Sequence, residues 1–177
     1  MRIYFSGGNA PPCIIFSDSA SNCAAVVDPS SGAASSVVTE HLRKRGITHI
    51  EEILFSRNSV SVARGLHRLL INYPVKSIVL PEKQKYERIK SFYNYLEKAG
   101  ADEKILCKTS EKIKIMRQKD VVRLEYFKRC AKLKIVLFLK KTSSGWQIGC
   151  ENSGKECFSL DLIRDGKERI YCYEFRK

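Results

Sequence analysis

Apolar and polar positions follow two different periods along the first hundred residues of the chain. Short apolar runs typical of buried strands lie at 2–5, 13–16, 24–28, 50–56 and 76–80. Apolar residues three and four apart predict helices from Ser35 or Ser36 to Arg45, from Val62 to Tyr73 and from Lys83 to Ala99. Gly46 and Gly100 follow two of these helices, where a terminating glycine is expected. The alternation favours a layered α/β fold in which helices connect the strands.

From residue 101 onward the pattern becomes rich in strands. Strands are predicted at 104–109, 112–116, 133–140, 146–150, 158–163 and 169–175, and apolar residues at helical spacing favour a helix over 117–132. TSSG (142–145) and RDGK (164–167) predict hairpin turns, because Asp165-Gly166 in particular suits a turn with positive φ at both central residues. No linker divides the chain, so we expect one domain over residues 1–177, with a strand/helix half (1–100) and a strand-rich half (101–177).

Composition narrows the class of protein. A chain of 177 residues that is 44% hydrophobic is long enough for one well-buried core. No stretch approaches the roughly 20 apolar residues that span a bilayer, and no signal-peptide pattern follows Met1. The seven cysteines are an odd number without a C-x-x-C pair, which argues against a zinc ribbon and favours reduced thiols. Reduced thiols in turn favour the cytoplasm for a free protein.

The net charge of +13 lies mainly in the second half of the chain. Residues 1–80 carry eight basic and five acidic residues, for +3, whereas 108–141 carry twelve and three, for +9. Lys and Arg side chains neutralise phosphates, so this region is a candidate for nucleic-acid binding. A solvated basic surface is an equally good interpretation. The candidate phosphate contacts in this region are Lys112, Lys114, Lys132 and Lys134.

Residues 1–82 resemble the start of the metallo-β-lactamase fold. The similarity is greatest to the hydrolase-like domain of the DNA-uptake competence protein ComEC. Asp28 matches the family's strand-end aspartate, Ser30 to Gly32 its turn, HLRKRGITHIEEILFS its next helix and strand, and Gly65-Leu66 the start of the following helix. The opening IYFSGGNAPPCIIF matches the first hairpin. The resemblance implies an α/β fold with layered αββα architecture, here shortened, in which mixed sheets carry helices on their outer faces.

The same resemblance implies that the metal-binding loop has degenerated. Arg57, Ser59, Ser61 and Val62 stand where the family places the ligands of its H-x-H-x-D-H motif. Arginine repels a cation, valine has no donor atom and neutral serine oxygens are poor zinc ligands. The chain also has no Gly-Asp dipeptide and no histidine after His67. We therefore expect no metal and no cofactor, and we expect the three histidines to be packed or on the surface.

These observations favour a catalytically inactive, ComEC-like domain that acts as a binding module. Arg57 and Arg64 lie on or beside the ancestral metal loop, so a phosphate-binding cleft is retained in this interpretation. Nucleic acid, with DNA favoured by the resemblance, is the expected partner, and a protein partner is the alternative. An active nuclease or phosphodiesterase that uses Ser59 or Ser61, and a purely structural domain, remain open. The compartment is extracytoplasmic if the domain belongs to a ComEC-like membrane protein.

Overall fold

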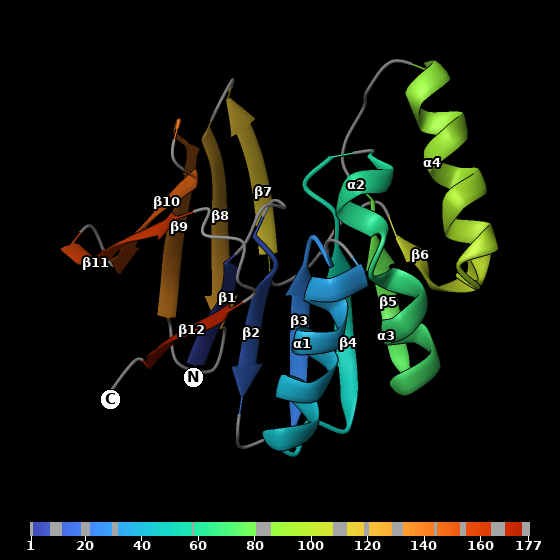
Figure 1. Cartoon of the computed structure of the whole chain (residues 1–177), viewed down its shortest axis with the longest axis horizontal. Helices are drawn as coiled ribbons and strands as arrows, with labels where there is room; N and C mark the ends of the chain where they lie inside the picture. Colours follow the sequence, from blue (N-terminus) through green and yellow to red (C-terminus); the bar gives the residue numbers. More distant parts are fainter. Residues whose placement is uncertain are drawn as a thin grey trace.

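The computed structural model shows a mixed α/β fold in which helices and two β-sheets form layers (Figure 1). It describes residues 2–7, 12–18, 22–29, 32–57, 59–80, 86–107, 113–118, 121–128, 133–143, 145–152, 155–163 and 169–174. The mixed α/β class predicted from the sequence is therefore confirmed.

The larger sheet has the strand order β12-β1-β2-β3-β4-β5-β6. Its strands are β1 (Arg2–Gly7), β2 (Ile14–Asp18), β3 (Cys23–Val27), β4 (His49–Leu54), β5 (Val75–Val79), β6 (Leu106–Cys107) and β12 (Arg169–Glu174). The pairs from β12 to β3 are antiparallel, and the pairs from β3 to β6 are parallel. The carboxyl ends of β3, β4, β5 and β6 consequently lie along one edge of the sheet.

Helices provide the crossovers between the parallel strands, as the alternating pattern predicts. They are α1 (Gly32–Lys44), α2 (Val60–Ala63), α3 (Leu66–Asn72) and α4 (Tyr86–Lys98), so the helix predicted from Val62 is split into two. Gly46 and Gly100 follow α1 and α4 with φ of 68° and 87°, the left-handed conformation that glycine adopts at little cost. The two helix ends were thus predicted correctly.

Two hydrophobic cores hold the layers together. The first lies between the helices and the larger sheet, and its helix residues recur at helical spacing: Val38 and Leu42 on α1, Leu66 and Leu69 on α3, and Phe92 and Leu96 on α4. The second lies between the sheets, where apolar side chains alternate along each strand, for example Ile135, Leu137 and Leu139. Alternate residues of β3 and β4 therefore serve different cores.

The smaller sheet is antiparallel and has the strand order β11-β10-β9-β8-β7. Its strands are β7 (Ile113–Gln118), β8 (Val121–Lys128), β9 (Leu133–Lys141), β10 (Gly145–Asn152) and β11 (Lys155–Ile163). The predicted TSSG turn is confirmed as a hairpin connection, because Lys141 of β9 lies opposite Trp146 of β10.

Three predictions in the second half of the chain were wrong. The proposed helix over 117–132 contains strand β8, whose Val122 and Leu124 face the core between the sheets; residues 119–120 and 129–132 lie outside the described part. The strands that flank RDGK do not pair: β11 pairs with β10, and β12 crosses to the larger sheet to pair with β1. The third error is only partial: the strand predicted at 104–109 is confirmed at Leu106–Cys107 and wrong at 104–105, which belong to a short 3-10 helix at Glu103–Ile105, while residues 108–109 lie outside the described part.

No helix within the described ranges combines the length and the apolar character needed to cross a membrane.

Candidate functional site

The segment between β4 and α2 lies at the carboxyl edge of the parallel strands (Figure 1). Parallel strands end at a common edge, and loops at this edge commonly carry binding and catalytic groups. The segment contains Arg57 and Ser59, two of the four predicted metal-loop positions, and leads directly to Ser61 and Val62 in α2.

Asp28 anchors the start of this segment. Its carboxylate accepts hydrogen bonds from the backbone N–H of Ser56 at 2.8 Å and from the Ser56 hydroxyl at 2.5 Å. Only 7% of Asp28 is exposed, and its own N–H donates to the carbonyl of Leu54 at 2.9 Å. Burial, with a smaller contribution from the charge of Asp28, raises the pKa of the nearby Cys13 thiol. Asp28 therefore joins the ends of β3 and β4 through a buried carboxylate.

Helix α2 is fixed against the same edge. The N–H of Gly65, just after α2, donates to the carbonyl of Pro29 at 2.7 Å. Val62 is fully buried in the core between the helices and the larger sheet. Val62 is thus a core residue of α2 rather than a residue of an open site, and it cannot supply a ligand.

Ser59 and Ser61 are brought together by the turn that begins α2. Their hydroxyl oxygens lie 2.8 Å apart, and the Val62 N–H donates to the carbonyl of Ser59 at 3.1 Å. A nucleophilic serine needs a base as its hydrogen-bond partner, whereas each of these hydroxyls has the other. The arrangement supplies neutral hydrogen-bonding groups at the surface.

Two arginines accompany this pair of hydroxyls. Arg57 is partly buried and Arg64 is exposed at the end of α2. Burial raises the pKa of Tyr95 on α4, and the positive charge of Arg64 offsets part of that rise, which places Arg64 near α4. The segment from Arg57 to Arg64 therefore contains two permanently positive side chains and two hydroxyls.

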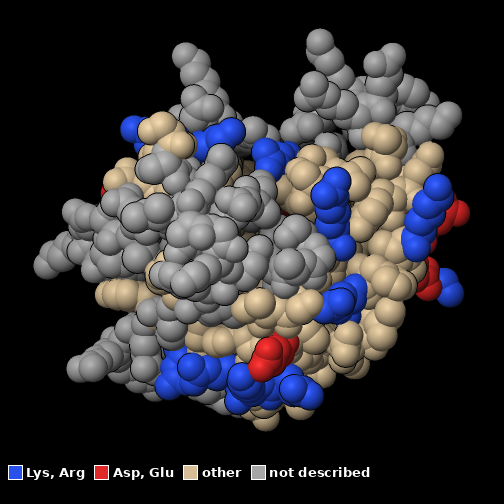
Figure 2. Space-filling view, viewed as in Figure 1, with Lys and Arg blue, Asp and Glu red and all other residues tan. Residues whose placement is uncertain are grey.

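The basic candidates of the second half are only partly described. Lys114 is exposed on β7 of the smaller sheet, whereas Arg57 and Arg64 lie at the carboxyl edge of the larger sheet. Lys112 and Lys132 lie outside the described residues, and Lys134 belongs to β9 but its side chain is not described. On the face drawn in Figure 2, Lys and Arg side chains gather over the C-terminal end of α1 and are scattered over the region of α2 and α3.

Two of the three histidines have packing contacts. The His41 ring meets the Tyr4 ring edge-on at 4.2 Å between centroids, and burial followed by the charges of Arg45 and Lys44 lowers the pKa of His41. His67 donates from Nδ1 to the carbonyl of Ala99 at 3.1 Å. These contacts agree with the expected structural role of both residues.

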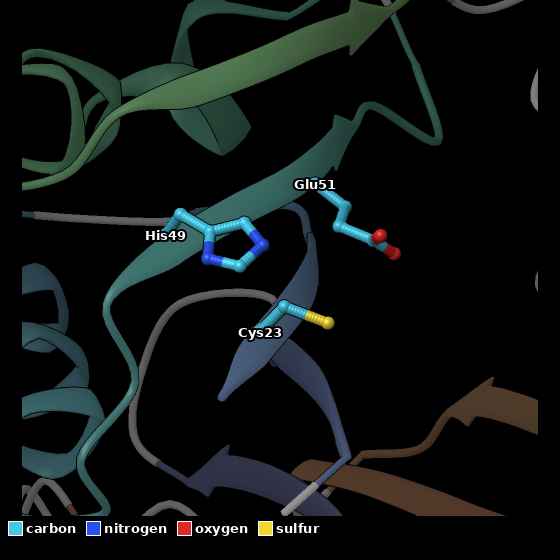
Figure 3. A group of neighbouring side chains, drawn as sticks. All are labelled: Cys23, His49 and Glu51. Carbon is cyan, nitrogen blue, oxygen red and sulfur yellow. The ribbon is translucent and has the colours of Figure 1, made fainter. Parts of the chain in front are cut away.

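The third histidine belongs to a cluster that sequence reasoning missed. His49 lies with Cys23 and Glu51 at the opposite, amino edge of the larger sheet, and one ligand atom from each residue lies within 4.8 Å of the others (Figure 3). Among the described residues this is the group of His, Cys, Asp and Glu side chains that is close enough to hold a metal ion. The sequence signal was weak, because Cys23 and His-x-Glu stand 26 residues apart without a recognisable motif.

Comparison with known proteins adds no assignment: neither a scan against models of protein families nor a search of curated proteins gave a match to this chain.

Proposed function

We propose that this chain is a metallo-β-lactamase-like domain of the ComEC type, without metal ligands in the usual loop, that binds the phosphate backbone of nucleic acid, with DNA favoured. The observation that carries the proposal is the segment from Arg57 to Arg64, which brings two arginines and the paired hydroxyls of Ser59 and Ser61 to the carboxyl edge of the parallel strands. Positive side chains and hydroxyls together make a site for phosphate oxygens rather than for a cation.

The strand order supports the family part of the proposal. An antiparallel run from β1 to β3 is followed by parallel strands with helical crossovers, and helices, sheet and sheet form three successive layers, as we would expect for an αββα fold. Asp28 directly follows β3, at the position that the resemblance matches to the family's aspartate, and it bonds Ser56 immediately before the loop. Both features support the proposal of a metallo-β-lactamase-like fold with changed ligand positions.

The charge of the chain supports the nucleic-acid part. A net charge of +13 attracts polyanions at long range, and each Lys or Arg that contacts a phosphate releases counterions on binding. Neutral hydroxyls such as those of Ser59 and Ser61 also donate hydrogen bonds to phosphate oxygens without reading the base sequence. The expected binding is consequently salt-sensitive and weakly dependent on sequence.

The test compares two neutralised pairs of basic residues. In Arg57→Gln/Arg64→Gln, two charges at the loop edge are removed, whereas Lys76→Gln/Lys98→Gln removes two exposed charges near the amino edge. Binding to short duplex DNA is measured by fluorescence anisotropy between about 50 and about 200 mM salt. Loss of two phosphate contacts reduces the slope of log affinity against log salt by about 1.8 for the first pair.

The control pair should keep a slope close to that of the unaltered protein, and the DNA should be recovered intact. Equal slopes for the two variant pairs would remove the loop edge from the proposal. Degradation of the DNA would replace a binding module by a nuclease. A parallel Lys114→Gln variant measures whether the smaller sheet contributes a contact of its own.

A further inference from the structure

The amino edge of the larger sheet brings together three different metal-binding side chains. Cys23 is the first residue of β3, His49 is the first residue of β4, and the parallel register sets these two residues opposite each other. Glu51 follows two residues after His49 on β4. Figure 3 shows all three side chains directed toward a common space from the two neighbouring strands.

An irregularity in the pairing of β3 with β4 shapes this space. Ala24 lies opposite Ile50, but Ala25 lies opposite Glu52, so Glu51 is an extra residue in β4. Ile50 and Ile53 both enter the core beneath the helices, which leaves His49 and Glu51 on the other face. Such bulges change the direction of side chains and occur often at functional sites.

The hydrogen bonds of His49 leave one ring nitrogen available for a ligand. The Thr48 hydroxyl donates to the carbonyl of Asn22 at 3.3 Å and lies 3.2 Å from Nδ1 of His49. In the tautomer in which Nδ1 donates to this hydroxyl oxygen, Nε2 carries the lone pair, and in Figure 3 the far edge of the ring faces Cys23 and Glu51. A hydrogen bond to the remote nitrogen is the usual way in which proteins orient a metal-binding histidine.

We propose that Cys23, His49 and Glu51 form a binding site for a zinc-like transition-metal ion. A thiolate, an imidazole and a carboxylate suit zinc and its neighbours better than magnesium or calcium, which prefer oxygen ligands. With bonds of about 2.0–2.3 Å, ligand atoms in a tetrahedral site stand about 3.3–3.8 Å apart. The three atoms, within 4.8 Å of one another, therefore need to close by about 1 Å.

The surroundings permit that closure and allow an ion to reach the site. Cys23 is 7% exposed, whereas His49 and Glu51 are partly exposed at the end of the sheet. Closure of the site by about 1 Å requires rotation of these side chains toward a common ion. Three protein ligands leave the fourth position of a tetrahedral ion for water.

The site is separate from the loop discussed above. Cys23 and Asp28 are five residue steps apart along β3, which corresponds to about 17 Å along an extended strand. Metal binding at the amino edge is therefore compatible with the absence of ligands at Arg57, Ser59, Ser61 and Val62. The proposed site nevertheless differs from the expectation of a metal-free chain, in which His49 was assigned a packed or surface position.

Cobalt titration of the full chain, stripped of metal by a chelator and kept reduced, tests the proposal. Thiolate-bound Co²⁺ has a charge-transfer absorption in the near ultraviolet, and the expected result is one Co²⁺ per chain with this band, displaced by one Zn²⁺. The Cys23→Ala variant should lose the band, and His49→Gln and Glu51→Gln should weaken Zn²⁺ binding at least about tenfold. Matched variants at other sites, Cys13→Ala and His67→Gln, should retain the band and the affinity of the unaltered protein.

Two results would overturn the proposal: no charge-transfer band at one Co²⁺ per chain, or a band that persists in the Cys23→Ala variant. Unchanged Zn²⁺ affinity in both His49→Gln and Glu51→Gln would overturn it equally. Circular dichroism confirms that each variant is folded. If Cys23→Ala does not fold, the variants of the two partly exposed ligands decide the question.

Discussion

Replacement of Asp28 by alanine should destabilise the protein by removing the bond between the ends of β3 and β4. The carboxylate of Asp28 accepts from both the N–H and the hydroxyl of Ser56, and both residues are buried. A hydrogen bond to a charged group contributes about 1.5–3 kcal/mol to stability. Loss of both bonds also leaves the buried Ser56 N–H without this acceptor.

The expected loss of stability in Asp28→Ala is the cost of the lost hydrogen bonds less the desolvation cost that is returned. Two such bonds amount to about 3–6 kcal/mol, and removal of a buried charge returns part of its desolvation cost. We therefore expect Asp28→Ala to lower the free energy of unfolding by about 2–4 kcal/mol. Ser56→Ala loses only the hydroxyl bond, so its effect should be about 1–2 kcal/mol. The double variant should be less destabilised than the sum of the two, by about 1 kcal/mol or more, because the residues share that bond.

Urea denaturation measures these differences. The single tryptophan, Trp146, packs against the core between the sheets and reports its unfolding by fluorescence, and circular dichroism reports the helices. Ser77→Ala is the matched control, since the Ser77 hydroxyl donates to the neutral carbonyl of Glu51 at 3.2 Å and should contribute about 1 kcal/mol. Additive effects of Asp28→Ala and Ser56→Ala, or a loss for Asp28→Ala no larger than for the control, would refute the reasoning.

Two further predictions concern the pH dependence of stability and the corrected strand. Burial, then the charges of Arg45 and Lys44, lower the pKa of His41 in the folded state below its ordinary value of 6.5, so the unfolded chain takes up the proton first as pH falls. Stability should therefore decline below about pH 6.5, and His41 should not affect stability above that pH. The His41→Gln variant should reduce the decline in urea midpoints between about pH 5 and 7. An identical decline in the variant would show that other groups cause the pH dependence. On β8, Leu124 is 1% exposed and Val121 is partly exposed on the other face, so Leu124→Ala should cost about 2–5 kcal/mol and Val121→Ala clearly less. Equal losses in urea denaturation would contradict the strand orientation.

The first half of the fold was predictable because its signals are local. Helix ends are marked by Gly46 and Gly100, and apolar stripes on α1 and α3 correspond to the core that they enter. On α4 the expected Leu96 is buried, but Tyr93 is 42% exposed and Phe92 enters the core instead. The helix prediction over β8 failed because the sequence VVRLEYFK fits both the helical and the strand period. Residues 121, 124 and 128 share a helix face, and residues 122 and 124 share a strand face. Pairing with β7 and β9 decides between them, and such pairing is not a local property.

The candidate sites, like β8, depend on pairing between strands that lie far apart in the sequence. The resemblance drew attention to the position of Asp28, but the two bonds of Asp28 to Ser56 span 28 residues and depend on the parallel pairing of β3 with β4. Val62 was assigned to a site position by register, yet helix α2 buries it. The Cys23, His49 and Glu51 cluster depends on the same parallel pairing and on one extra residue in β4. A shift of that pairing by one residue would separate the ligands, so spacing in the sequence does not reveal them.

The two edges of the larger sheet have opposite chemical preferences, and the distance between them makes this possible. Arg57 and Arg64 at the carboxyl edge favour an anion and would repel a cation bound beside them. The cluster at the amino edge lies about 17 Å away along β3, beyond the screening length of about 8–10 Å at physiological salt. A cation at one edge therefore costs the other edge little electrostatic energy. The proposed anion-binding loop and the proposed metal-binding cluster are thus compatible within one fold, because the same parallel pairing of β3 with β4 builds both edges.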